Sequence, residues 1–345
     1  METPILEFDN ATIQYTTESG PVTAVSNASF SVGRGSFFGL VGESGCGKST
    51  LAKSIIGGLD ENGKVTSGKI LYNGTEIQEY TQSELNKKIR WNKISYIPQA
   101  SMNSLDPLSK VSDQAWEIAS VHTELEYEEA MDKFRSMFNV VGLQESRIDD
   151  YPHQFSGGMQ QRAIIALSLF LDPKLIIADE PTTALDVIMQ DQVLKYLDKI
   201  QENTQISMLL ITHDISVVLE SCNKMAIMHS GQVAETGSTT EIFDNPKHPY
   251  SILLQEAFPD HREPNRDLTV IDGYPPETIG DIDYCTFASR CPWETEECHK
   301  FGPPLENISD NSIDHKAACV RKNEMDKLRN ERRQSSMAGR SKNND

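Results

Sequence analysis

The feature that most constrains this chain is the segment 42–50, which reads GESGCGKST and fits the pattern G-x-x-x-x-G-K-[ST]. Its glycines let backbone N–H groups close around a chain of phosphates. The pattern places Lys48 to reach the β- and γ-phosphates and the Ser49 hydroxyl to ligate Mg²⁺. The apolar run 37–41 is typical of a buried strand, and 49–56 of a helix whose N-terminus faces the phosphates. The expected phosphate-binding residues are Gly42, Ser44, Gly45, Cys46, Gly47, Lys48, Ser49 and Thr50.

Charge and hydropathy limit the class of protein. The 345-residue chain has a formal net charge of −19, which argues against a nucleic-acid backbone as its main partner. No run approaches the roughly 20 apolar residues that span a bilayer, and residues 1–4 lack the features of a signal peptide. We therefore expect a cytosolic chain that meets a membrane only through a partner. In such a chain the six cysteines indicate metal or redox chemistry rather than disulfides.

The first hundred residues are predicted to be rich in short strands. The expected strands are 5–8, 11–15, a strand pair within 22–32, 68–74 and 93–99. Tyr15, at the end of its strand, either stacks on an adenine ring or packs within the sheet. Residues 112–139 carry helical periodicity, and their acidic side chains suit a solvated face.

A second informative stretch is 155–161, FSGGMQQ, in which a serine and two glycines open a predicted helix with an anion-seeking N-terminus. The apolar run 175–180 ends in Asp179 and Glu180. A strand-end aspartate can hold Mg²⁺ through water, and the next carboxylate can orient an attacking water. Asp186 follows, and the apolar run 208–212 leads to His213. Each of these signals is ambiguous alone.

In this order and at these spacings the motifs resemble those of the ATP-binding-cassette (ABC) ATPases over roughly residues 5–258. The family signature begins Leu-Ser-Gly-Gly-Gln, whereas this chain has Phe-Ser-Gly-Gly-Met, which keeps the serine and both glycines. The resemblance implies an α/β fold: a P-loop core of the RecA-like type, with an antiparallel β subdomain and a helical subdomain at about 100–160. The implied ABC domain spans residues 1–260.

The resemblance also implies roles for the site residues. ATP phosphates and Mg²⁺ would be held by Lys48, Ser49, Gln99 and Asp179, with Ser49 and Gln99 as Mg²⁺ ligands. Glu180 would polarise the attacking water, and His213 would contact the γ-phosphate. Two cassettes would face each other, with nucleotide between the P-loop of one and the signature of the other. The further implied nucleotide-site residues are Tyr15, Ser156, Gly157, Gly158 and Asp186.

Three segments narrow the resemblance to the peptide-importer branch: the signature itself, NSLDP at 103–107 and NPKHPY at 245–250. The branch serves dipeptides and oligopeptides, and some members serve nickel or oligosaccharides, which remain an alternative. The implied function is the ATP-hydrolysing subunit at the cytoplasmic face of the membrane. Its implied partners are a paralogous ATPase, two transmembrane permeases and an extracytoplasmic solute-binding protein, with no nucleic acid.

Two other classes stay open at this point. One is an exporter cassette separated from its membrane part. The other is a soluble ABC protein of translation or DNA repair. The single P-loop argues against a translation-type member, because these usually carry two cassettes in one chain. The lack of a sustained heptad pattern argues against a repair-type member with long coiled coils.

The predicted extension at 261–325 holds four cysteines, with five, six and twenty residues between successive members. Four thiolates suit Zn²⁺ or an Fe–S cluster. Their spacing resembles that of branch members that hold a [4Fe–4S] cluster; Zn²⁺ and free buried thiols are the alternatives. The four are Cys285, Cys291, Cys298 and Cys319. Cys222 is expected to pack within a helix. The polar flexible tail 326–345 is expected to be partly helical or disordered.

Overall fold

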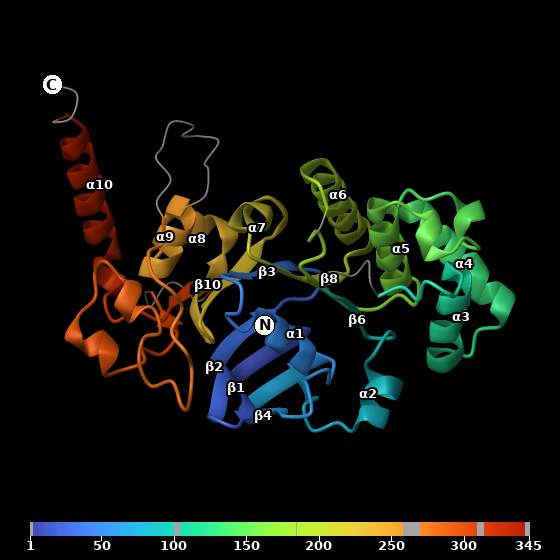
Figure 1. Cartoon of the computed structure of the whole chain (residues 1–345), viewed down its shortest axis with the longest axis horizontal. Coiled ribbons are helices and arrows are strands. Elements are labelled where there is room, and N and C mark those ends of the chain that lie inside the picture. Colours follow the sequence, from blue (N-terminus) through green and yellow to red (C-terminus); the bar gives the residue numbers. More distant parts are fainter. Residues whose placement is uncertain (1–2, 100–103, 184, 258–269, 309–313, 342–345) are drawn as a thin grey trace.

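The computed structural model describes residues 3–99, 104–183, 185–257, 270–308 and 314–341, which form two β-sheets with helices around them (Figure 1). Within these residues the larger sheet has the strand order β11-β12-β10-β9-β3-β8-β7-β6. Its strands are β11 (Glu306–Asn307), β12 (Lys316–Ala317), β10 (Gln232–Ser238), β9 (Lys224–His229), β3 (Phe37–Gly42), β8 (Ser207–Thr212), β7 (Leu175–Asp179) and β6 (Ile94–Ile97).

The central strands of this sheet run parallel, from β9 through β3, β8 and β7 to β6. Every residue of β3, β7 and β8 is buried, as expected for parallel strands with both faces covered. The predicted runs 37–41, 175–180 and 208–212 supply these strands. Their carboxyl ends therefore meet at one edge of the sheet, where a ligand site is expected in an open α/β fold.

The smaller sheet is antiparallel, with the order β2-β1-β4-β5. Its strands are β2 (Gly20–Val32), β1 (Leu6–Thr17), β4 (Gly63–Tyr72) and β5 (Thr75–Glu76). The prediction of separate strands at 5–8 and 11–15 is wrong, because both belong to β1. The register with β2 shifts between Phe8 and Ala11, and Asn10 has a positive φ of 49°. Such a bulge absorbs an extra residue without ending the strand. Likewise, 22–32 belongs to one strand and not to a pair.

Helices complete the fold on both sides of the core sheet (Figure 1). They are α1 (Lys48–Ile55), α2 (Gln82–Lys88), α3 (Val111–His122), α4 (Tyr127–Val140), α5 (Gly157–Leu169), α6 (Val187–Thr204), α7 (Ile215–Ser221), α8 (Thr239–Asp244), α9 (Pro249–Ala257) and α10 (Met325–Ser341). The predicted helical region 112–139 is thus two helices, α3 and α4. Cys222 lies just beyond α7, as its C-cap, and not within the helix. Among the described residues, none of the helices combines the length and apolar character of a membrane span.

The helical part, with α3, α4 and α5 at the right of Figure 1, packs around a cluster of aromatic side chains. Phe134 meets both Phe138 and Phe170 edge-on, with ring centroids 4.9 and 5.5 Å apart. All three rings are fully buried. This packing joins α4 to the end of α5, and so fixes the position of the helix that the signature opens.

The C-terminal part is joined to the core sheet through β12, which pairs with β10. The carboxylate of Glu235, wholly buried in β10, accepts hydrogen bonds from the backbone N–H groups of Lys247 and His248 at 2.7 and 2.9 Å. His315 Nε2 lies 2.7 Å from the same carboxylate. A buried carboxylate requires such partners, so this cluster holds the C-terminal segment on the sheet.

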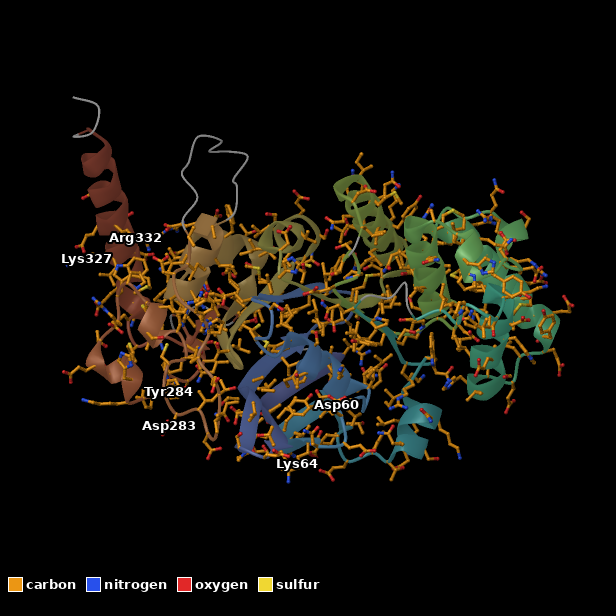
Figure 2. The ribbon with its side chains drawn as sticks, in the orientation of Figure 1. Asp60, Lys64, Asp283, Tyr284, Lys327 and Arg332 are labelled. Atoms are coloured by element: carbon orange, nitrogen blue, oxygen red, sulfur yellow. The ribbon has the colours of Figure 1, made fainter. Side chains whose placement is uncertain are left out.

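Helix α10 follows at the far end of the molecule, and Figure 2 labels Lys327 and Arg332 on it. Asp326 pairs with Lys247 Nζ at 2.6 Å, and the Arg332 guanidinium lies over the Trp293 ring, 5.6 Å from its centroid. Met325 is fully buried. The first turns of α10 therefore pack on the body of the protein.

Candidate functional site

The P-loop connects β3 to α1 and has the closed shape that the sequence predicts. Gly47 is the N-cap of α1, with φ 103°, a conformation that residues with a Cβ rarely adopt. A Cβ at Gly47 would also lie 2.3 Å from the carbonyl oxygen of Ala24 in β2. The backbone N–H of Gly231 donates to the Cys46 carbonyl at 3.0 Å, which ties the loop to the β9–β10 turn. The loop is thus fixed by contacts with β2 and with the β9–β10 turn.

Lys48 lies inside this loop and is 4% exposed. Its Nζ donates to the carbonyl oxygens of Gly42 and Glu43 at 2.8 and 2.9 Å, and lies 3.7 Å from Cys46 Sγ. Burial raises the pKa of the Cys46 thiol, so that thiol stays neutral and does not compete for the lysine charge. The Lys48 ammonium is therefore held inside the loop by backbone carbonyls, at the position where the phosphates of a nucleotide would bind.

Asp179 is the last residue of β7, and both of its carboxylate oxygens accept hydrogen bonds. Ser49 Oγ donates to Oδ1 at 3.1 Å, and the Tyr96 hydroxyl donates to Oδ2 at 2.9 Å. Burial raises the pKa of Asp179, against the effect of these two hydrogen bonds. Burial, together with the charge of Asp179, also raises the pKa of Tyr96. Ser49 and Asp179 thus bring together oxygen donors of the kind that Mg²⁺ prefers.

Glu180 follows in a left-handed conformation, φ 47°, and its N–H donates to the Ile211 carbonyl at 2.8 Å. Its carboxylate accepts hydrogen bonds from Gln99 Nε2 and Thr183 Oγ1, both at 2.9 Å. His213 Nδ1 lies 3.3 Å from the other oxygen. Strained backbone of this kind persists where the surroundings fix it, often at functional sites. Three predicted site residues, Gln99, Glu180 and His213, therefore meet.

The signature residues lie elsewhere in the same chain. Ser156 is the N-cap of α5, with Gly157 and Gly158 in its first turn, and Figure 1 draws α5 well apart from α1. A Cβ at Gly158 would lie 1.9 Å from Met189 Cε of α6, so the end of the methionine side chain would have to move to admit one. Asp186 caps α6 by accepting a hydrogen bond from the Met189 N–H at 3.0 Å. The signature and the Asp186 loop are thus neighbours, and Figure 1 draws α5 and α6 apart from α1.

Tyr15 lies in β1, where it pairs with Val22 and with Gly63. Its ring lies against the Gly63 backbone, because a Cβ at that glycine would be 2.5 Å from Tyr15 Cε1. The side chain is partly exposed. Its role toward an adenine ring stays a prediction.

The four C-terminal cysteines line one cavity, together with apolar side chains that include Phe287, Trp293 and Met325. The N–H of Cys285 donates to the Cys298 carbonyl at 2.9 Å, which brings two turns of the extension together. Burial raises the pKa of Cys285 to about 11 and those of Cys291 and Cys319 to about 12. Within the described residues, no three His, Cys, Asp or Glu side chains form a group that could hold a metal ion as they stand.

Three residues of the site are absent from the sequence prediction. Tyr96 and Thr183 are near predicted positions, three residues before Gln99 and three after Glu180, but nothing in their local pattern indicates a contact. Arg290 has no local signal at all. It reaches the P-loop from the cysteine-bearing extension, and its guanidinium forms a bidentate ion pair with Glu43, both contacts being 2.8 Å.

Comparison with protein families finds two matches. Residues 25–183 match the ABC transporter family, and residues 234–298 match the oligopeptide/dipeptide transporter C-terminal region. The first match contains the P-loop, the signature, Asp179 and Glu180. The second contains three of the four cavity cysteines and Arg290. The two matches therefore cover both the predicted nucleotide site and most of the cysteine-bearing segment.

Comparison with individual proteins gives the same assignment. The chain is 40% identical over 310 residues to the dipeptide transport ATP-binding protein DppD of Bacillus subtilis, covering 89% of this chain and 92% of that one. It is 39% identical over 307 residues to the oligopeptide transport ATP-binding protein OppD of Escherichia coli, covering 88% and 90%. Among solved structures, the dimeric cassette MJ0796 with ADP and phosphate superposes with a TM-score of 0.61 at 28% identity, over 68% of this chain and 98% of that one.

The geometry of Gly47 predicts that replacing it by alanine weakens binding of a fluorescent ATP analogue at least about tenfold. Left-handed backbone costs a residue with a Cβ about 1–2 kcal/mol, and 1.4 kcal/mol is tenfold in affinity; the contact with Ala24 adds to this. Gly74→Ala is the matched control, since Gly74 has φ 75° but a Cβ there would make only an ordinary contact, 3.6 Å from Thr3 Cγ2. We expect the control to bind nucleotide normally. Unchanged binding by Gly47→Ala would contradict this account.

Proposed function

The chain belongs to the ABC transporter ATP-binding proteins of dipeptide and oligopeptide transport, and from this premise we propose that it hydrolyses ATP to drive peptide uptake through a membrane importer. The observation that carries the proposal is the convergence of Ser49, Asp179 and Glu180 at the carboxyl ends of β3 and β7. A P-loop serine, a strand-end aspartate and a following glutamate are the groups that phosphoryl transfer to water requires.

Each residue of the site has a separate proposed role. On nucleotide binding, Lys48 would exchange its two carbonyl partners for phosphate oxygens, which carry more charge. Mg²⁺, held by Ser49 and Gln99 with Asp179 beside Ser49, would neutralise negative charge on the phosphates. Tyr96 keeps the Asp179 carboxylate in place. Because Gln99, Thr183 and His213 already surround Glu180, its carboxylate is oriented before a water arrives.

We expect Glu180→Gln to keep ATP binding and to slow hydrolysis about 10²–10⁴-fold, the usual contribution of a general base. The amide retains the shape of the side chain but cannot take a proton, so the closed form with ATP should accumulate. The measurement is phosphate release by the intact transporter, with Glu202→Gln on the exposed face of α6 as the control. Hydrolysis at the wild-type rate would show that Glu180 has another role.

We further propose that the chain acts as one half of a pair of cassettes. Its signature lies apart from its own P-loop, so it would close the site of a partner. The dimeric structure of MJ0796 with ADP and phosphate supports such an arrangement. In the branch that the sequence resembles, the partner is a paralogous ATPase, and two transmembrane permeases and an extracytoplasmic solute-binding protein complete the importer. The chain would then work at the cytoplasmic face of the membrane.

This assembly predicts that the chain alone is a weak ATPase. Co-expression with the paralogous ATPase and both permeases should recover all four chains on a tag placed on this one, with ATPase activity stimulated by the peptide-loaded binding protein. Gly158→Arg, which places a large charged side chain in the signature and displaces the end of Met189, should bind ATP but support little turnover of the assembly. Full transport-coupled turnover with permeases and this chain alone would overturn the heterodimer.

We also propose that the cysteine cavity holds a [4Fe–4S] cluster, with Zn²⁺ as the alternative. Four thiols around one cavity match the ligand set of such a cluster. Zn²⁺ would use the same sulfur ligands. Among the described residues the cysteines form no ready group for either metal centre as they stand. Besides the cysteines, the ionisable residues in the cavity lining are His248 and Arg321. Burial lowers the pKa of His248 to about 3, so a structural or sensing role fits better than acid–base chemistry.

Anaerobically purified protein should therefore be brown and contain about four iron and four sulfide per chain. Cys291→Ser should bleach the colour and loosen the extension while ATP binding persists. Cys222→Ser is the matched control, because Cys222 is also buried but lies outside the cavity. Zinc without iron in metal analysis would establish the alternative, and the absence of both metals would refute the metal centre.

A further inference from the structure

A chain of direct contacts leads from the cysteine cavity to the phosphate-binding lysine. Arg290 immediately precedes Cys291 and ends the 3₁₀ turn Ala288–Arg290. Its two terminal nitrogens contact the two carboxylate oxygens of Glu43, each at 2.8 Å. The backbone carbonyl of Glu43 accepts a hydrogen bond from Lys48 Nζ at 2.9 Å. Arg290 and Glu43 therefore connect the wall of the cysteine cavity to Lys48.

The arginine is held in place by its surroundings. Its side chain is only 4% exposed, and its Nη1 lies 3.1 Å from Nε2 of His229. The other ring nitrogen of His229, Nδ1, lies 3.1 Å from the hydroxyl of Thr286. The guanidinium also lies over the Phe287 ring. A buried, bidentate arginine with fixed neighbours gives a specific geometry that a flexible surface pair does not.

Glu43 is held at its backbone as well as its side chain. Its N–H donates to the hydroxyl of Tyr250 in α9 at 3.1 Å. The ring of Tyr250 packs against Phe287, with centroids 5.3 Å apart. The same part of the extension thus positions the first turn of the P-loop through two independent contacts, one charged and one through Tyr250.

The charge of this pair affects nucleotide binding directly. Glu43 is a carboxylate within the loop that must receive several phosphate charges, and its side chain is only 26% exposed. Solvent therefore screens it incompletely. Arg290 supplies the compensating positive charge. Without the arginine, Glu43 would repel the phosphates and would lose the partner that keeps its side chain away from them.

We propose that Arg290 is a positioning residue of the nucleotide site, through which the cysteine-bearing extension sets the affinity of the chain for ATP. The inference rests on the proposed ATPase function, and it adds a role for the extension that is independent of what the cysteines bind. Because a coupling free energy between two sites is reciprocal, bound ATP would in turn stabilise the turn that carries Cys291.

The test is a double-mutant cycle on the full chain, measured as the Kd for a fluorescent ATP analogue. Arg290→Gln should weaken binding about tenfold, and Glu43→Gln should change it less than threefold. The double variant should bind at least threefold more tightly than Arg290→Gln alone, because it removes the uncompensated carboxylate. Arg321→Gln is the matched control: Arg321 also lies beside a cavity cysteine, but it pairs locally with Glu324.

A merely structural role for Arg290 predicts the opposite result for the double variant. If Arg290 only packs the extension, removing Glu43 as well cannot restore affinity, so an unrestored double variant refutes the inference, as does wild-type affinity in Arg290→Gln. If Arg290→Gln does not fold, Arg290→Lys replaces it, and should bind ATP several-fold more weakly through loss of the bidentate contact. A wild-type chain that fails to bind the ATP analogue would instead refute the proposed function.

Discussion

The closed turn of the P-loop is the constraint on which the rest of the site depends. The turn requires left-handed backbone at Gly47, next to a neighbouring strand that leaves no space for a side chain. With that turn in place, the carbonyls of Gly42 and Glu43 bind the Lys48 ammonium. A buried ammonium needs such partners, so the loop keeps its shape before a nucleotide arrives. Binding then exchanges one set of oxygen partners for another, with little rearrangement of the backbone.

The parallel sheet brings distant parts of the chain to this loop. Asp179 lies 130 residues beyond Ser49 in the sequence, yet the two side chains are in hydrogen-bond contact. The register of β3, β8 and β7 makes this possible, since it aligns their carboxyl ends at one edge. Glu180 and His213 meet for the same reason. The proposed site residues thus belong to a rigid scaffold, and precise positioning is most of what phosphoryl transfer requires from a protein.

Prediction from sequence succeeds for elements whose structure is determined by residues close together in the sequence. The glycine-rich loop, the apolar runs of β3, β7 and β8 and the helix after Ser156 all follow from nearby residues, and the ABC fold is confirmed. The bulge at Asn10 is missed because polar residues inside a strand look like a turn. The contact of Tyr96 with Asp179 and the pairing of Arg290 with Glu43 depend on tertiary geometry. The latter joins residues 247 positions apart, and neither partner shows a local sign of the other.

The attachment of β12 to β10 has a consequence for the order in which the protein is made. The two partners Glu235 and His315 are 80 residues apart in the sequence. At a synthesis rate of about 5–20 residues per second, the ribosome needs roughly 4–16 s to add them. During that interval β10 is an open sheet edge on the nascent chain, and open edges invite pairing with other chains. The strand β12 therefore joins the sheet only after the rest of the sheet has been synthesised. A chain whose synthesis stops before β12 would leave β10 unpaired on that side and would be prone to aggregation.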